Sequence, residues 1–152
     1  MKKISQIAAG IAFVLAAGTA LAQESAQVLV TEGHAKGAGR TYAVDFYSDG
    51  TAVGFNVDLS VGGLDASKID LSQCKKLVLK DKATTGGCSF TEGVVRFVGV
   101  NTDLRPLPKG WHNLGAFGVS SLPKGGVVQT KVVATNAEGR AVDVGYEYAA
   151  DK

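Results

Sequence analysis

The stretch from Thr51 to Val61, TAVGFNVDLSV, alternates between two kinds of side chain at every step. The apolar positions are Val53, Phe55, Val57, Leu59 and Val61. The positions between them are small or polar: Ala52, Gly54, Asn56, Asp58 and Ser60. Successive side chains of a β-strand point to opposite faces, so this period of two predicts a strand with one buried face.

Strand patterns recur along the rest of the chain, separated by turn-forming residues. Ser48-Asp49-Gly50 lies between the segments 41–47 and 51–61 and predicts a hairpin that joins them. The segment 65–72, DASKIDLS, has room for one helical turn at most. About eight or nine strands and no long helix predict an all-β fold, a sandwich or a barrel. The other expected strands are 27–32, 77–79, 93–101, 114–121, 126–136 and 140–149.

The first 22 residues have the three parts of a secretory signal peptide. Lys2 and Lys3 precede an apolar run from Ile7 to Ala17, and residues 20–22, Ala-Leu-Ala, supply the small side chains of a cleavage site. The apolar run is shorter than the roughly 20 residues that a spanning helix needs. We therefore expect residues 1–22 to be removed and residues 23–152 to form a single domain.

The charge balance of the expected mature chain is neutral. Without Lys2 and Lys3, 14 basic side chains face 14 acidic ones. No domain-wide positive field remains, which argues against nucleic acid as a partner. The sequence after residue 22 contains no apolar stretch long enough to span a membrane. We expect a secreted or periplasmic protein without a membrane span after signal cleavage.

Cys74 and Cys88 are the only cysteines of an exported chain, which predicts a disulfide between them. Closing the 15-residue loop would contribute about 3 kcal/mol on the chain-entropy model. A metal site would need more ligands, and His34 and His112 lie far away in the sequence. No metal and no other cofactor is expected.

Motifs for catalysis are incomplete. Residues 118–122, Gly-Val-Ser-Ser-Leu, depart from the Gly-x-Ser-x-Gly elbow at the last position. The segment from Asp45 to Asn56 has asparagine where a calcium loop needs a bidentate glutamate. No pair of carboxylates stands out as a glycosidase centre. We expect a protein that is not an enzyme.

Trp111, His112 and Asn113 are the candidate ligand-binding residues. The single tryptophan lies in PLPKGWHNLG, a predicted loop, where it could stack on a sugar ring while its two neighbours hydrogen-bond hydroxyls. The alternative is that Trp111 packs across the end of the fold. Tyr146 and Tyr148 are expected to pack in the core or at an edge. Lysines at 75, 76, 80 and 82 predict a solvated strand edge, or a site that binds an acidic protein or glycan surface.

Several segments, taken in order, resemble the cohesin family of secreted β-sandwich modules. Residues 48–71, SDGTAVGFNVDLSVGGLDASKIDL, are similar to an early pair of elements. Residues 93–121, GVVRFVGVNTDLRPLPKGWHNLGAFGVSS, resemble a later hairpin, and residues 132–144, VVATNAEGRAVDV, the penultimate one. The resemblance covers residues 26–149.

The resemblance implies a jelly-roll β-sandwich related to carbohydrate-binding modules. Family members are non-catalytic; typical cohesins hold dockerin domains through one sheet face, and related sandwiches bind polysaccharide. We therefore predict a secreted binding module that holds an extracytoplasmic protein partner or a polysaccharide through a sheet face or loop tips. The alternatives are a carbohydrate-binding module that uses Trp111, and a structural or assembly subunit of the cell envelope.

Overall fold

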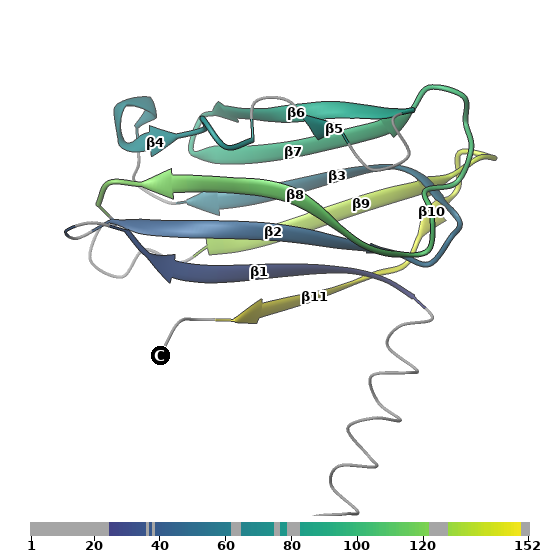
Figure 1. Ribbon diagram of the computed structural model, residues 1–152, viewed down its shortest axis with the longest axis horizontal. Helices are drawn as coiled ribbons and strands as arrows, with labels where there is room; N and C mark the ends of the chain where they lie inside the picture. Colours follow the sequence, from purple (N-terminus) through teal and green to yellow (C-terminus); the bar gives the residue numbers. More distant parts are fainter. Residues whose placement is uncertain are drawn as a thin grey trace, which may run out of the picture.

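The computed structural model is a sandwich of two β-sheets (Figure 1). It describes residues 25–35, 37, 39–61, 65–74, 77–78, 83–121 and 128–149. The predicted signal peptide and the four lysines between 75 and 82 lie outside these residues. Sheet A has the order β11 (Val144–Ala149), β1 (Ala26–His34), β2 (Arg40–Ser48), β8 (Gly110–Val119) and β4 (Ile69–Asp70). Sheet B has the order β10 (Ala141–Val142), β9 (Val128–Asn136), β3 (Ala52–Val61), β7 (Val94–Asn101), β6 (Thr84–Thr91) and β5 (Leu77–Val78).

The all-β jelly-roll sandwich predicted from the sequence is confirmed. Eight strands have six residues or more, and three have two. β1 and β11 pair in parallel, and all other strand pairs are antiparallel. The expected helical turn is a 3₁₀ turn at Ala66–Lys68, capped by the Asp65 side chain.

The two sheets share one apolar core, built from the alternation along their strands. Val57 and Leu59 of β3 are fully buried. Aromatic rings fill the space between the sheets: Phe46 of sheet A stacks on Phe55 of sheet B with 4.9 Å between ring centroids. Phe97 and Phe117 meet across the same space at 6.2 Å. The core therefore leaves the outer face of each sheet to the alternate residues.

The hairpin predicted at Ser48-Asp49-Gly50 is wrong, because β2 lies in sheet A and β3 in sheet B. The connection crosses from one sheet to the other. The Ser48 hydroxyl donates to the Leu107 carbonyl at 3.1 Å, and Gly50, with φ of 91°, donates its N–H to that hydroxyl. Two strands with one apolar face each can pair edge to edge or pack face to face, and the pattern alone does not distinguish the two. β7 and β8 also lie in different sheets.

The strand β6 was missed from the sequence. Its segment, TTGGCSFT, places two glycines in the middle and shows no clear alternation. A Cβ atom on Gly86 would lie 1.8 Å from the Val98 carbonyl oxygen, so this backbone approach requires glycine. Cys88 of β6 and Cys74 lie at disulfide-bonding distance, with 5.6 Å between their Cα atoms. This pair ties the segment after β4 in sheet A to sheet B.

Candidate functional site

The fold offers two broad surfaces, the outer faces of sheet A and sheet B. On β2 and β8 of sheet A, the register sets outward residues side by side in four rows. The rows are Tyr47 with Trp111, Asp45 with Asn113, Ala43 with Ala116, and Thr41 with Gly118. β4 extends the last row with Asp70. Directly opposite residues of paired strands share a face, so these side chains form one continuous strip.

Trp111 lies at one end of this strip, inside β8 rather than in the loop predicted from the sequence. Its side chain is 44% exposed. The Tyr47 ring, which is nearly buried, contacts it edge-on with 5.3 Å between ring centroids. Tyr47 therefore supports a tryptophan that remains open to solvent.

His112 points to the opposite side of β8 from Trp111. It is 6% exposed, and its Nε2 lies 2.7 Å from the Pro108 carbonyl oxygen. Its Nδ1 has no hydrogen-bond partner among the described residues. The three neighbouring residues predicted as one ligand site are therefore split: Trp111 and Asn113 lie on the outer face, and His112 supports the loop before β8.

Asn113 is held in a fixed orientation next to Trp111. Its Nδ2 donates to Asp45 Oδ1 at 2.8 Å, and its Oδ1 accepts the Gly115 N–H at 3.1 Å. Asp45 Oδ2 and the second amide hydrogen of Asn113 make no further contact among the described residues. Asp45 could not be predicted as a partner, because only the β2–β8 register brings it beside Asn113.

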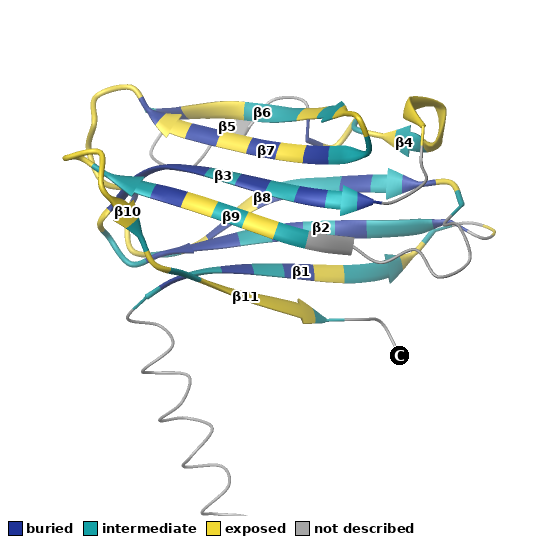
Figure 2. Cartoon of the chain, turned by 180° about the vertical axis from the view of Figure 1, so that it is seen from behind, coloured by how far each residue is buried: buried dark blue, intermediate teal, exposed yellow. Residues whose placement is uncertain are grey.

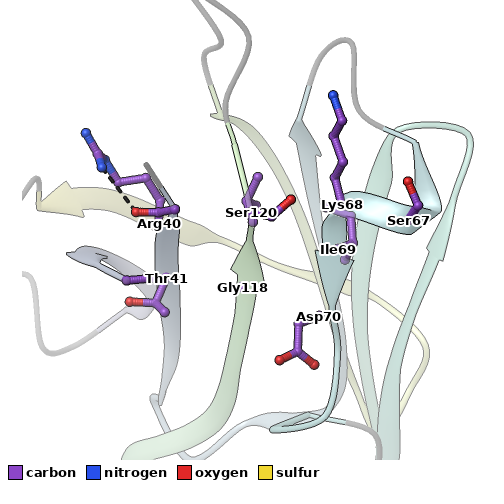
Figure 3. A pocket seen from close by; sticks show the side chains of 11 residues that line it. Arg40, Thr41, Ser67, Lys68, Ile69, Asp70, Gly118 and Ser120 are labelled. Atoms are coloured by element: carbon purple, nitrogen blue, oxygen red, sulfur yellow. Dashed lines mark hydrogen bonds between the residues drawn. The ribbon is translucent and has the colours of Figure 1, made fainter. Parts of the chain in front are cut away.

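The other end of the strip is hollow. Ala43, Ala116 and Gly118 carry little or no side chain, and a pocket of about 330 Å³ lies over the strand ends beyond them. Figure 3 shows Thr41 on one side of Gly118 and Asp70 on the other. The pocket is also lined by Ser67, Lys68 and Ser120, so its rim carries hydroxyl groups and charges of both signs.

The outer face of sheet B has a different character. Three valines at outward positions of β7 and β9 are exposed: Val98 by 40%, Val100 by 45% and Val133 by 44%. β3 separates them with Gly54 and Asn56, which the register places opposite Val100 and Val98. Figure 2 shows exposed and buried residues in turn along β7. The segment 93–100, GVVRFVGV, already indicates this patch, because it is apolar at both alternating sets of positions except Arg96.

Charged residues border the valines on the same face. Arg96 donates from Nε and Nη2 to the two carboxylate oxygens of Asp58, both at 2.7 Å. These hydrogen bonds are the main cause that lowers the pKa of Asp58, with smaller contributions from Asn56 and Lys131. The face therefore combines three exposed valines with a neighbouring row of paired charges, and Asn56 lies between Val98 and Val133.

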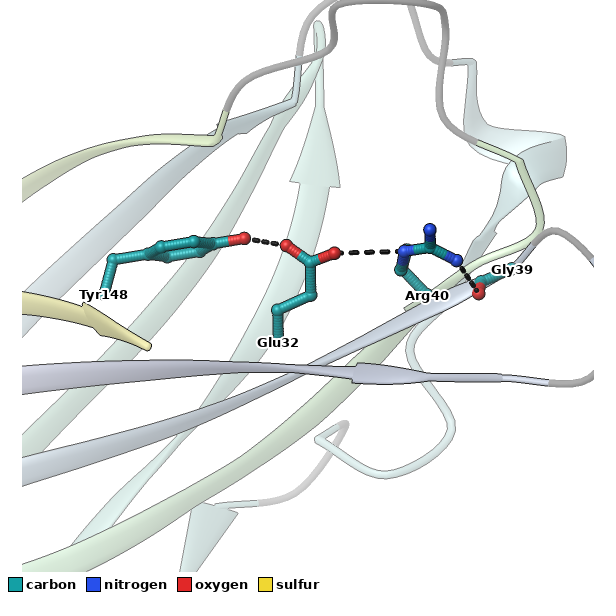
Figure 4. Close-up of polar contacts among 4 residues, drawn as sticks. All are labelled: Glu32, Gly39, Arg40 and Tyr148. Carbon is teal, nitrogen blue, oxygen red and sulfur yellow. Dashed lines mark hydrogen bonds and ion pairs between the residues drawn. The ribbon is translucent and has the colours of Figure 1, made fainter. Parts of the chain in front are cut away.

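A polar cluster closes the edge between β11 and the β1–β2 pair (Figure 4). The Glu32 carboxylate accepts from Tyr148 Oη on one oxygen and from Arg40 Nε, at 3.0 Å, on the other. Burial, and then the charge of Glu32, raise the pKa of Tyr42 to about 12. Tyr146 and Tyr148 lie on the edge strand, as predicted, and are 45% and 38% exposed. We assign this cluster to holding the last strand in place.

Two features, a metal-ligand cluster and a membrane-spanning helix, are absent from the described part of the chain. Histidine, cysteine and acidic side chains there form no group of three that could hold a metal ion. None of the helical segments described is long and apolar enough to cross a bilayer.

Comparison with known proteins identifies the fold. No family model matches the sequence, and no curated protein sequence matches it. Solved structures do: a type II cohesin module of the ScaA scaffoldin of Acetivibrio cellulolyticus has a TM-score of 0.53 at 15% identity, over 84% of this chain and 95% of that one. A type I cohesin–dockerin complex from Clostridium thermocellum gives 0.57 at 10% identity, over 84% and 95%. The type II cohesin A11 of Bacteroides cellulosolvens gives 0.53 at 9%, over 82% and 99%. The chain therefore has the β-sandwich fold of cohesin modules, as its resemblance predicted.

Proposed function

We propose that this chain is a non-catalytic binding module that holds a protein partner outside the cytoplasm through the outer face of sheet B. The observation that carries the proposal is the group of exposed valines Val98, Val100 and Val133 on that face, on the strands on either side of β3. Exposed apolar patches with polar rims mark interaction sites on soluble proteins. The fold supports the same function, because one of the similar structures is a complex of a cohesin with a dockerin.

The size of the face fits a specific contact. Four strands about 4.8 Å apart and about eight residues long give a flat area of roughly 500 Å². A standard interface buries about 800 Å² of accessible surface on each partner, a measure that includes the relief of side chains. The face therefore provides most of one such contact without any loop.

The arrangement of the face also fits an interface. Interfaces have apolar centres and polar rims. Here the valines lie on the strands on either side of β3, and Arg96 and Asp58 lie beside them as an already formed ion pair. A partner that covers the valines does not have to desolvate an unpaired charge at this pair. Desolvation is the main free-energy cost of burying a charge.

The experiment compares two variants of matched chemistry on the two faces. Val100→Glu places a charge in the middle of the sheet B patch, and Thr31→Glu places one on an exposed position of β1. Each variant and the unaltered protein would be used for affinity capture from the envelope and medium of the producing cell. We expect the same protein with the unaltered chain and with Thr31→Glu, and its loss with Val100→Glu.

Two outcomes would contradict the proposal. One is a partner that Val100→Glu still captures, with all three proteins melting at the same temperature. The other is capture of a second copy of the chain alone, which would support the envelope-assembly alternative. A size measurement of the unaltered protein by light scattering separates the two cases.

Export belongs to the same proposal. The basic, apolar and small-residue parts of residues 1–22 support a signal peptide, and a disulfide needs an oxidising compartment. Mass spectrometry of the protein from its native source should give a chain that begins at Gln23. A protein that retains Met1 and stays in the cytoplasm would refute this part.

A second candidate function is carbohydrate binding, and Trp111 favours it. The side chain is open to solvent and lies beside the fixed Asn113–Asp45 pair. Ligand sites combine aromatic surface with a few oriented polar groups. This candidate uses sheet A, so it does not compete with a protein partner on sheet B.

A further inference from the structure

We propose that the outer face of sheet A is a binding trough for an extended, neutral polysaccharide chain, which lies along β2 and β8 from Trp111 to the hollow beside Asp70. The inference goes beyond protein binding on sheet B and rests on separate residues. It extends the Trp111 site to a defined path and a class of ligand.

The first part of the path is a stacking surface. Trp111 is 44% exposed and is supported by Tyr47 at 5.3 Å between ring centroids. A large aromatic that is held in place loses little conformational freedom when a ligand covers it. The apolar face of a sugar ring suits such a surface, while the hydroxyls at the ring edge remain free for hydrogen bonds.

The second part is a pair of oriented polar groups next to the tryptophan. Asn113 and Asp45 bind each other at 2.8 Å, and each retains one hydrogen-bonding position that no described residue uses. The carboxylate oxygen accepts and the amide hydrogen donates. Two neighbouring hydroxyls of one sugar can supply the matching donor and acceptor, which an apolar protein surface cannot.

The third part is a floor of small side chains. Beyond the Asp45–Asn113 row, the outward residues are Ala43, Ala116 and Gly118. The floor ends in the pocket of about 330 Å³, where Thr41 and Ser120 carry hydroxyl groups and Asp70 forms part of the lining. Trp111 and Gly118 are seven residues apart on one strand, so the path is roughly 20 Å long at about 3.3 Å per residue. A straight path of this length suits several sugars in an extended chain.

The charges along the trough indicate that the ligand is neutral. Asp45 and Asp70 line the path, and Lys68 and Arg40 line its far end. Arg40 is already paired with Glu32 at 3.0 Å. Among the residues that the structure describes, this face therefore carries no excess of positive charge that would attract an acidic polysaccharide.

The test uses the intrinsic fluorescence of Trp111, which is the only tryptophan in the chain and reports on this site alone. The probes are cellohexaose, xylohexaose and mannohexaose, with polygalacturonate as the anionic comparison. We expect a saturable change with at least one neutral probe and no change with the anionic one. Binding by none of the neutral probes, or by polygalacturonate alone, would overturn the proposal.

Variants, measured by calorimetry, locate the site. Trp111→Ala should weaken binding about tenfold or more through loss of the stacking surface, and Asn113→Ala about fivefold. Ala116→Leu should abolish binding by filling the floor. The matched control is Tyr146→Ala, because Tyr146 is 45% exposed but lies at the sandwich edge. It should bind as the unaltered protein does.

The outcomes separate this proposal from protein binding on sheet B. Glycan binding that survives both Trp111→Ala and Ala116→Leu would overturn the trough. Loss with Val100→Glu instead would place the glycan on sheet B and overturn it as well. A protein partner that is lost with Ala116→Leu would show that the trough holds protein. Melting curves of each variant check that the fold is kept.

Discussion

The outer faces of the two sheets present different chemistry on the same kind of backbone. Sheet B carries exposed valines on the strands on either side of β3, with the Arg96–Asp58 ion pair beside them. Sheet A carries one supported tryptophan, an oriented Asn113–Asp45 pair and a floor of small residues. Neither outer face contributes to the apolar core, because the core is built from the inward-pointing residues of each strand. A β-sandwich of this size can therefore offer two independent binding surfaces.

The largest expected effect separates the core from the faces. Phe97 and Val98 are neighbours in β7 that point to opposite sides, with 0% and 40% exposure. Phe97→Ala should lower the free energy of unfolding by about 3 to 5 kcal/mol, because it leaves a cavity between the sheets. Val98→Ala should change it by less than about 0.5 kcal/mol. Urea unfolding of both variants measures the difference, and similar losses would show that the sheet B face is part of the stabilising core.

The second prediction concerns the covalent tie between the sheets. Cys74 and Cys88 should be bonded, so thiol titration of the denatured, unreduced protein should find no free thiol. Reduction should cost about 3 kcal/mol, the value expected for a loop of this length. Thermal unfolding with and without reductant measures it. Free thiols in the protein from its native source would refute the bond. A melting temperature that does not change on reduction would show that the disulfide does not stabilise the fold.

The smallest effect tests the Arg96–Asp58 ion pair on the outer face of sheet B. Arg96 lowers the pKa of Asp58 in the folded protein, so the pair stabilises the fold above the ordinary pKa of an aspartate. That contribution is lost as the pH falls through the lowered pKa of Asp58. Arg96→Met should therefore destabilise the protein only slightly at pH 7, because the pair is exposed to solvent, and the difference should vanish in acid.

NMR titration of the Asp58 carboxyl provides the direct measurement for this pair. Its midpoint should rise in Arg96→Met towards the ordinary value. Lys131→Met is the matched control, because Lys131 contributes less to the lowered pKa than Arg96. Equal midpoints in the unaltered protein and in Arg96→Met would contradict the assignment of Arg96 as the main cause of the lowered pKa of Asp58.

Much of the fold could be predicted from the sequence, and the candidate site only in part. Alternation located β3 and most other strands, because it reports directly on which side chains are buried. It could not tell that β2 and β3 belong to different sheets, since Phe46 can meet Phe55 across the core as well as along an edge. β6 was hidden because Gly86 and its neighbour interrupt the pattern.

The site depended on information that is not local in the sequence. Trp111 could be singled out because it is the only tryptophan in the sequence. Its position within β8 points the next residue, His112, to the inner side of the sheet, so His112 does not join Trp111 in a ligand site. Asp45 becomes relevant only through the register of β2 against β8. The valines at 98 and 100 could have been noticed, because a strand that is apolar on both faces needs cover on both.

The most direct test of the central claim is photocrosslinking in the producing cell. A photoreactive phenylalanine analogue would replace Val98 on sheet B in one variant and Thr31 on sheet A in another. The account predicts a crosslinked protein partner from position 98 and none from position 31. A protein crosslinked only from position 31, or none from position 98, would contradict the assignment of protein binding to sheet B.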